Sequence, residues 1–361
     1  MASHHVNRLR RIFGWDRLPK KVHLATIWIA ATGTLLSAYF ILAANAFMQH
    51  PVGYVLNQTR GRAELTNIMK VLTQNTAYSA FLHTIPSAFL TAGALFAGVA
   101  GWMIVKGRDA DIARPVLKAG LITVVISFLI VGVSGDYTAR IMTKQQPMKM
   151  AAAEALYDSK ANAPFSIFTI GTLDGSRPVF QIGIPSMLSF MSTGNFNGVV
   201  EGVNDLQKQY TAKYGAGNYK PNIPLAYWSF RLMIGFGAIA TLLAALVLWL
   251  MRKGRLPKGR WFGISMIVLP FLPILANSFG WIFTESARQP WVVFGLMKTA
   301  DGVSPTVNTG SVAFTVVVFT LLYGLLAVIE FGLIRRTIKV GPEPEGMHAK
   351  AEEASTLVMA Y

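Results

Sequence analysis

Six long apolar stretches constrain what this chain can fold into. Each is 19 to 29 residues long, and a helix needs about 20 apolar residues to cross the hydrocarbon core of a bilayer. They are residues 24–47, 77–105, 116–134, 224–251, 261–284 and 309–334. Only Lys118, Arg231 and Glu330 carry a formal charge inside them. Because backbone groups in lipid must bond internally, the pattern predicts an all-α integral membrane protein with six transmembrane helices.

The net charge of +16 reflects membrane topology more than an affinity for nucleic acid. If the N-terminus is cytoplasmic, the inner segments 1–22, 106–118, 252–260 and 335–361 hold 19 Lys and Arg in 71 residues. The outer segments 48–76, 135–223 and 285–308 hold 13 in 142 residues. This positive-inside bias predicts that both termini are cytoplasmic. The lipid bilayer is therefore the expected partner, and no nucleic acid is expected.

The same topology divides the chain into five parts. The longest outer connection, residues 135–223, is expected to form a loop on the periplasmic side. The others are a basic cytoplasmic segment (1–22), two three-helix groups (23–134 and 224–334) and a cytoplasmic tail (335–361). The absence of cysteine excludes only disulfides and thiolate ligands.

Unusual polar residues occur at the outer ends of three spans. Glu285 follows the uncharged run 261–284, and a carboxylate at the mouth of a span indicates a functional site. His83 lies about 9 Å down the second span, and Met233 lies about 14 Å down the fourth, close to Arg231. A histidine, a thioether and a carboxylate at one side of a bilayer favour an iron centre.

Each of these residues also has a structural interpretation. His83 could be a neutral core histidine bonded to a neighbouring helix, and Met233 could simply fill a gap in apolar packing. Arg231 needs an anion such as a haem propionate, or else it extends its charged end to the outer interface. Glu285 could form an ordinary helix-end ion pair with Arg288.

Several strings resemble subunit I of the cytochrome bd-type quinol oxidases, a family of bacterial terminal oxidases. They are FGWDRL (13–18), ANAFMQHP (44–51), HT (83–84), KGRD (106–109), GD (135–136), KMAAAE (149–154), FRLM (230–233) and GW-x3-E-x2-RQPW (280–291). The last string is highly specific. His50 departs from the family, which usually has asparagine at that place.

The resemblance implies a low-spin haem b at the outer ends of the spans. His83 and Met233 match its two axial ligands, and Arg231 matches the arginine that supports it. With both axial positions filled, such a haem passes electrons and does not bind oxygen.

A second, high-spin haem b is implied by the most specific string. Glu285 matches its carboxylate ligand, Trp281 matches the aromatic residue between haems, and Arg288 matches a propionate partner. The six spans match the fourth to ninth of nine in the family, so the residue that binds haem d is absent from this chain. We therefore expect haem d only in the full complex, and no quinol:oxygen oxidoreductase activity from the isolated chain. Without an opposing histidine, Glu285 is expected to be protonated or to turn toward Arg288 or the interface.

Quinol oxidation is assigned by the resemblance to the long outer loop. Lys149 and Glu154 match the family residues implicated in this step. Five residues on a helix place them about 140° apart, so we expect contacts with opposite parts of a head-group site, away from the spans. The alternative is that residues 147–157 form a solvated amphipathic helix.

The implied function is that of a haem-containing oxidoreductase subunit of aerobic respiration. It would oxidise ubiquinol or menaquinol at the outer face of the bacterial inner membrane and pass electrons through b haems toward oxygen. The implied partners are subunit II and a small accessory subunit.

Two other classes of protein remain as alternatives. One is a non-redox transporter, since intramembrane Arg and Glu also occur along substrate paths. The other is a non-catalytic fragment or assembly partner. Absorption in the Soret region distinguishes a haem protein from a transporter.

Overall fold

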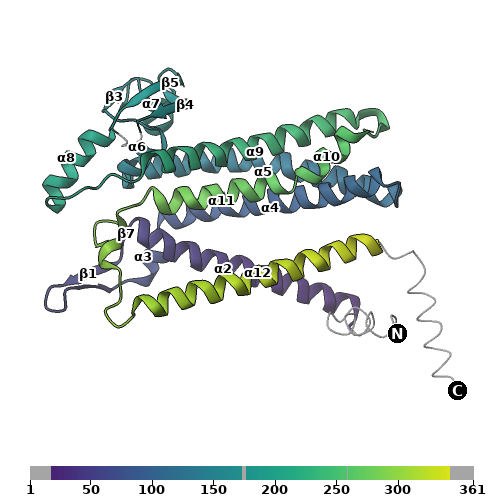
Figure 1. The fold of residues 1–361 in the computed structure, drawn as a ribbon, viewed down its shortest axis with the longest axis horizontal. Coiled ribbons are helices and arrows are strands. Elements are labelled where there is room, and N and C mark those ends of the chain that lie inside the picture. Colours follow the sequence, from purple (N-terminus) through teal and green to yellow (C-terminus); the bar gives the residue numbers. More distant parts are fainter. Residues whose placement is uncertain (1–17, 173–175, 258, 342–361) are drawn as a thin grey trace. The chain divides into compact units, whose positions relative to one another are not determined.

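The structure is a computed structural model that describes residues 18–172, 176–257 and 259–341. The FGWDRL string and the two predicted cytoplasmic ends, 1–22 and 335–361, therefore lie largely outside the described residues. In Figure 1 the colours follow the sequence from purple at the N-terminus to yellow at the C-terminus, and the main elements are labelled.

The described residues are mostly helical and contain six helices long and apolar enough to cross a membrane. They are α2 (Lys20–Gln49), α4 (Asn75–Val105), α5 (Ala110–Gln145), α9 (Ile223–Leu250), the pair α10 (Arg260–Val268) and α11 (Phe271–Ser286), and α12 (Thr309–Val340). Every predicted apolar stretch lies within one of these helices or helix pairs, except that α9 ends at Leu250, one residue before the predicted end at Met251. The predicted helical membrane fold with six spans is therefore confirmed, whereas the periplasmic side of the loop 135–223 stays a prediction.

Two of the spans differ from the prediction. The helix predicted over 116–134 continues as α5 to Gln145, because no helix-breaking residue occurs before Pro147. An ion pair of 2.9 Å between Asp136 and Arg140 supports this extension on the helix surface. The span predicted over 261–284 is divided, since Pro270 follows α10 and cannot donate a backbone hydrogen bond.

Helix α12 shows how local chemistry sets an element's ends. Asn308 caps its start by accepting a hydrogen bond of 2.8 Å from the backbone N–H of Ser311. Gly341 ends it with a φ of +77°, a conformation that glycine adopts readily. Along its length no residue is buried, as expected for a helix whose apolar surface contacts lipid.

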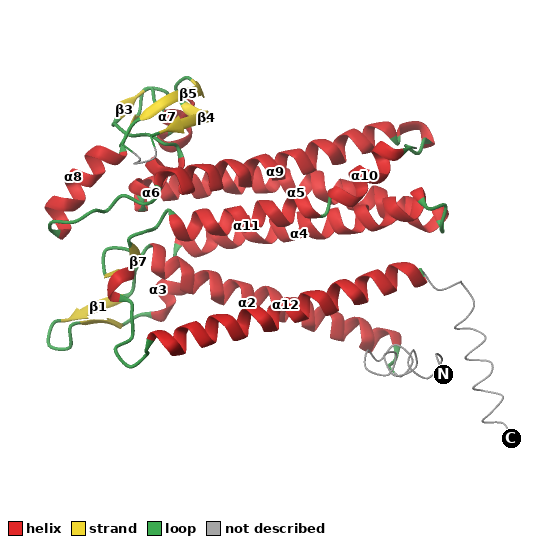
Figure 2. Cartoon of the chain, in the orientation of Figure 1, coloured by secondary structure: helices red, strands yellow, loops and turns green. Residues whose placement is uncertain are grey.

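The connections contain short elements, of which the sequence analysis had considered only a helix over 147–157 (Figure 2). Four two-stranded antiparallel sheets are present in the described residues. They pair β1 (Tyr54–Asn57) with β2 (Arg62–Leu65), β3 (Lys160–Ala161) with β6 (Val199–Val200), β4 (Phe165–Gly171) with β5 (Pro178–Ile184), and β7 (Trp291–Val293) with β8 (Met297–Lys298). The short helices are α3 (Ile68–Leu72), α6 (Pro147–Ala153), α7 (Met187–Thr193) and α8 (Val203–Tyr214), with 3-10 turns at Arg252–Gly254 and Thr299–Asp301. The shortest of these strands have only two residues and carry too little periodicity to be recognised in a sequence, whereas β4 and β5, with seven residues each, were missed.

The chain divides into two compact units. Unit 1 comprises Met1–Phe89, Ser127–Gly235 and Leu275–Gly302, and unit 2 comprises Leu90–Ile126, Phe236–Ile274 and Val303–Tyr361. All the predicted site residues belong to unit 1. Its main core is built from fully buried residues of the loop and of α9, including Leu206, Tyr219 and Tyr227.

In unit 2, glycines allow the backbones of α4 and α5 to come into contact. A Cβ added to Gly120 would lie 2.7 Å from the carbonyl oxygen of Gly93 and 2.8 Å from the backbone nitrogen of Ala97. Small residues at a crossing let membrane helices approach closely and gain dispersion contacts. Gly132, further along α5, has no atom within 4 Å of its added Cβ.

This difference predicts opposite effects of the same substitution on α5. Gly120→Ala should lower the free energy of unfolding by about 1–3 kcal/mol, because the methyl group pushes two backbones apart. Gly132→Ala should leave it unchanged or raise it by up to about 1 kcal/mol, because alanine favours helix. Thermal unfolding in detergent, followed by tryptophan fluorescence, measures both. Equal shifts for the two variants would contradict the proposed crossing.

Candidate functional site

His83 is held by α5. Its Nδ1 lies 3.2 Å from the hydroxyl of Ser134, and a Cβ on Gly135 would lie 3.3 Å from its Cε1. The glycine therefore lets the imidazole lie close to the α5 backbone. Since Nδ1 is engaged by the hydroxyl, Nε2 is the nitrogen that could bind a metal.

Met233 lies on α9 and packs against α11. A Cβ added to Gly280 would lie 3.0 Å from the Met233 sulfur, so the glycine provides the space that the thioether occupies. The adjacent Trp281 is 44% exposed. Because His83 contacts α5 and Met233 contacts α11, the two side chains have different protein neighbours.

Arg231 forms a buried ion pair with Glu154. Its Nη2 lies 2.6 Å from the Glu154 Oε2, and the two side chains are 9% and 1% exposed. The guanidinium also lies 4.7–5.1 Å from the ring centroids of Phe165, Tyr227 and Phe230. The protein itself therefore provides an anion for Arg231, and the side chain does not extend to an interface.

Glu154 was expected away from the spans, and this expectation is wrong. The segment that carries it folds back so that its carboxylate meets α9, and the backbone N–H of Ser166 also donates to Oε2 over 3.1 Å. Burial raises the pKa of Glu154 to about 7, against the opposing effect of the Arg231 guanidinium. Its Oε1 is buried and has no hydrogen-bond partner among the described residues.

Lys149 is also buried and contacts two spans. Its Nζ donates to the Gln49 side-chain oxygen at the end of α2 over 3.0 Å and to the Thr284 carbonyl of α11 over 3.2 Å. Burial lowers the pKa of Lys149 to about 7, with a further contribution from the charge of Arg288. The alternative of a solvated amphipathic helix over 147–157 is therefore wrong. Helix α6 ends at Ala153, and six of its seven residues are buried.

Glu285 has two partners at the end of α11. Arg288 Nη2 lies 2.5 Å from its Oε2, and Asn45 Nδ2 donates to its Oε1 over 3.0 Å. The expected attraction toward Arg288 is observed. The bond from α2 was not predicted, although Asn45 and Gln49 both lie in the ANAFMQHP string that contributed to the resemblance.

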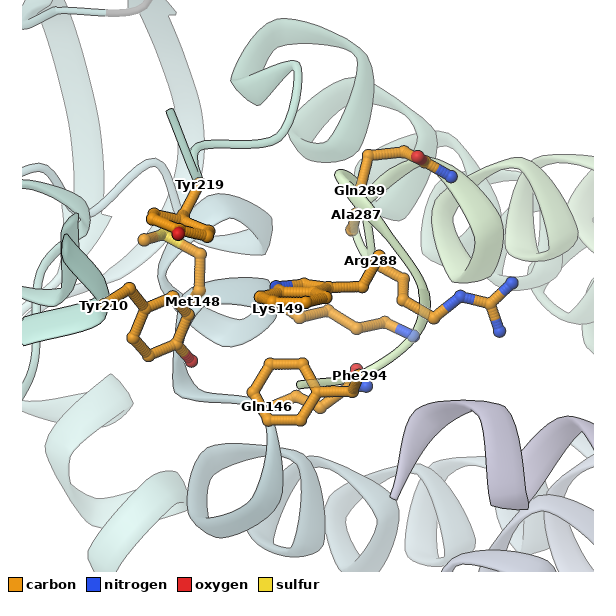
Figure 3. Close-up of a pocket in the computed structure, with 10 residues that line it drawn as sticks. Gln146, Met148, Lys149, Tyr210, Tyr219, Ala287, Arg288, Gln289 and Phe294 are labelled. Atoms are coloured by element: carbon orange, nitrogen blue, oxygen red, sulfur yellow. The ribbon is translucent and has the colours of Figure 1, made fainter. Parts of the chain in front are cut away.

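A small cavity of about 10 Å³ lies beside Lys149 (Figure 3). Tyr210, Tyr219, Arg288 and Trp291 contribute to its wall, and the Tyr219 and Trp291 rings stack with centroids 5.7 Å apart. The Tyr210 hydroxyl and the Trp291 indole nitrogen are buried without hydrogen-bond partners in the described part of the chain. The volume suits about one water molecule and is too small for a quinol head group.

The residues of unit 1 fit a haem better than a bare metal ion. Within residues 18–172, 176–257 and 259–341, no three His, Asp or Glu side chains gather to hold a metal. Haem supplies the equatorial nitrogens itself and needs only axial ligands from the protein. The Nε and Nη1 atoms of both Arg231 and Arg288 are buried and have no hydrogen-bond partner among the described residues, and such donors can bind an anion like a propionate.

Comparison with known proteins agrees with this chemistry. Residues 11–342 match the family model for cytochrome bd terminal oxidase subunit I. The chain is 39% identical over 338 residues to cytochrome bd ubiquinol oxidase subunit 1 of Bacillus subtilis (strain 168), covering 93% of this chain and 72% of that protein. A second Bacillus subtilis relative, a putative cytochrome bd menaquinol oxidase subunit I, is 27% identical and covers 87% and 69%.

A solved structure also has the same fold. The bd oxidase from Geobacillus thermodenitrificans superimposes with a TM-score of 0.77 at 25% sequence identity, over 92% of this chain and 74% of that chain. The match extends over nearly the whole sequence and includes the helices that carry the candidate residues. The chain therefore belongs to the cytochrome bd terminal oxidase subunit I family.

Proposed function

We propose that the chain is the haem-bearing, quinol-oxidising subunit of a bd-type terminal oxidase. The observation that carries this proposal is the ion pair between Glu154 and Arg231. It connects a candidate quinol residue to the turn of α9 that also holds Met233, the candidate haem ligand. Electron donor and electron acceptor would then meet at adjacent sites within unit 1.

The side chains divide into two sets that could each hold a haem b. His83 and Met233 would hold the low-spin haem b, and Arg231 would offer its Nε and Nη1 donors to a propionate. Glu285 would hold the high-spin haem b, supported by Arg288 and Trp281. When bound, haem supplies one-electron transfer.

Lys149 and Glu154 would handle the protons of quinol oxidation. Each quinol releases two electrons and two protons, so its hydroxyls need proton acceptors. The unpartnered Oε1 of Glu154 can accept a hydroxyl proton when the carboxyl is ionised. Lys149, whose pKa is also about 7, can accept the second hydroxyl proton in its neutral form, so both protons of the quinol have an acceptor while its two electrons would pass to the haem. The buried positions of both residues exclude bulk water.

The setting of this reaction follows from the family and the charge pattern. The substrate would be a membrane quinol, ubiquinol or menaquinol, oxidised at the outer face of the bacterial inner membrane. Both termini would be cytoplasmic. The partners would be subunit II and a small accessory subunit, and the product of the whole assembly would be reduced oxygen.

One prediction from this proposal tests the low-spin haem. His83→Ala should abolish the reduced-minus-oxidised spectrum of the low-spin haem b, because one of its two axial ligands is lost. His50→Ala, at the end of α2, is the matched control and should keep that spectrum. A spectrum that survives His83→Ala would show that His83 is not the ligand. The complete absence of Soret absorption in the unsubstituted protein would favour a transporter.

Another prediction separates the roles of residues in quinol oxidation from roles in haem binding. Lys149→Ala and Glu154→Gln should slow reduction of the b haem by quinol by about 100-fold, the usual scale of a lost acid–base group. Reduction by dithionite should remain complete, because glutamine keeps the shape of the side chain next to Arg231. Lys144→Ala, an exposed lysine on α5, is the control. Loss of haem from the Lys149 and Glu154 variants would instead indicate a folding role.

A pH profile tests the proton acceptor. Glu154 is protonated below its pKa of about 7 and ionised above it, so it can accept a proton only as the pH rises through this range. The ratio of the wild-type rate to the Glu154→Gln rate should therefore increase at least about threefold between pH 6 and pH 8. The ratio is used because the driving force of quinol changes with pH in both proteins. A constant ratio would contradict the role of Glu154 as base.

A further inference from the structure

A continuous chain of hydrogen bonds joins Lys149 to Glu285 through two amide side chains of α2. Lys149 Nζ donates to Gln49 Oε1 over 3.0 Å, and Gln49 Nε2 donates to Asn45 Oδ1 over 2.7 Å. Asn45 Nδ2 then donates to Glu285 Oε1 over 3.0 Å. Three bonds therefore connect a buried cation to a carboxylate that also pairs with Arg288.

The direction of these bonds is set by the charges at the two ends. A lysine ammonium can only donate, and an ionised carboxylate can only accept. Gln49 must therefore turn its oxygen toward Lys149 and its amino group toward Asn45, which in turn donates to Glu285. Flipping either amide would place like partial charges against each other. Bonds aligned in this way polarise and strengthen one another in a low-dielectric interior.

Gln49 also holds the start of α6 by its backbone. Its carbonyl accepts a bond of 2.6 Å from the side chain of Gln146, the residue that precedes α6. The last residue of α2 therefore fixes both the first turn of α6 and the tip of Lys149. Together these contacts make Gln49 the point at which α6 is attached to the membrane-spanning helix α2.

We propose that Asn45 and Gln49 are positioning residues that couple the candidate quinol residue Lys149 to the candidate haem ligand Glu285. The inference rests on the proposed roles of these two end residues. Carboxylates that bind metals are oriented by hydrogen bonds from neighbouring side chains, and losing such a bond typically weakens metal binding about 10- to 100-fold. Asn45 provides that bond, and Gln49 makes it depend on Lys149.

The experiment uses the haem-loaded protein and the spectral component that Glu285→Ala removes. Asn45→Leu should weaken retention of that haem about tenfold, measured by haem titration and optical difference spectra. Gln49→Glu keeps the side-chain volume and the acceptor for Lys149 but cannot donate to Asn45. It should shift the same component in the same direction, and it remains informative if Asn45→Leu fails to fold. Gln209→Leu, an exposed glutamine on α8, should leave the component unchanged.

A double-substitution comparison tests the coupling itself. Lys149→Met should shift the midpoint potential of the Glu285-dependent haem in the native background and cause a smaller shift in the Asn45→Leu background, where only the direct effect of the Lys149 charge on Glu285 remains. Equal shifts in both backgrounds, or an unchanged haem in both the Asn45 and Gln49 variants, would overturn the inference. If Glu285→Ala removes no haem component, the proposed haem role of Glu285 fails as well, so the two failures are distinguishable.

Discussion

The arrangement of unit 1 depends on the buried ion pair between Glu154 and Arg231. Removing two charges from water is costly, and the cost is offset only when attraction and further contacts are well arranged. Here the carboxylate accepts a backbone bond from Ser166, and three aromatic rings surround the guanidinium. The pair therefore commits the loop segment after α6 to one position against α9. Removing only one partner would leave an uncompensated charge in an apolar environment.

Helix α6 is attached at both ends, and this brings the candidate residues into one unit. At its start, Lys149 and Gln146 bond to the end of α2, and Lys149 also reaches α11. At its end, Glu154 bonds to α9. A helix of seven residues has little stability alone, so these tertiary contacts maintain it. Helix α6 is thus attached to α9 and α11, the spans that carry Met233 and Glu285, and to the end of α2.

The sequence analysis succeeded where one physical property acts along the chain and failed where partners are distant. Apolar length predicted all six spans. The cost of burying polar groups in lipid made His83, Arg231 and Glu285 candidates, and their roles stay predictions. The same reasoning missed the burial of residues 147–153, because an Ala- and Met-rich helix with one lysine also suits a solvated surface. It missed the roles of Asn45 and Gln49 as well, because the ANAFMQHP string does not show that their partners are Glu285 and Lys149, far away in the sequence.

What the sequence alone determined is the membrane class, the spans, the family resemblance and the set of candidate residues. These follow from local hydropathy and from short strings, both of which are properties of neighbouring residues. Tertiary structure decided the pairings, because Arg231 meets Glu154 across 77 positions and Asn45 meets Glu285 across 240. Such contacts depend on how whole helices pack and on where buried charges find opposite charges. No periodicity within a single segment specifies them.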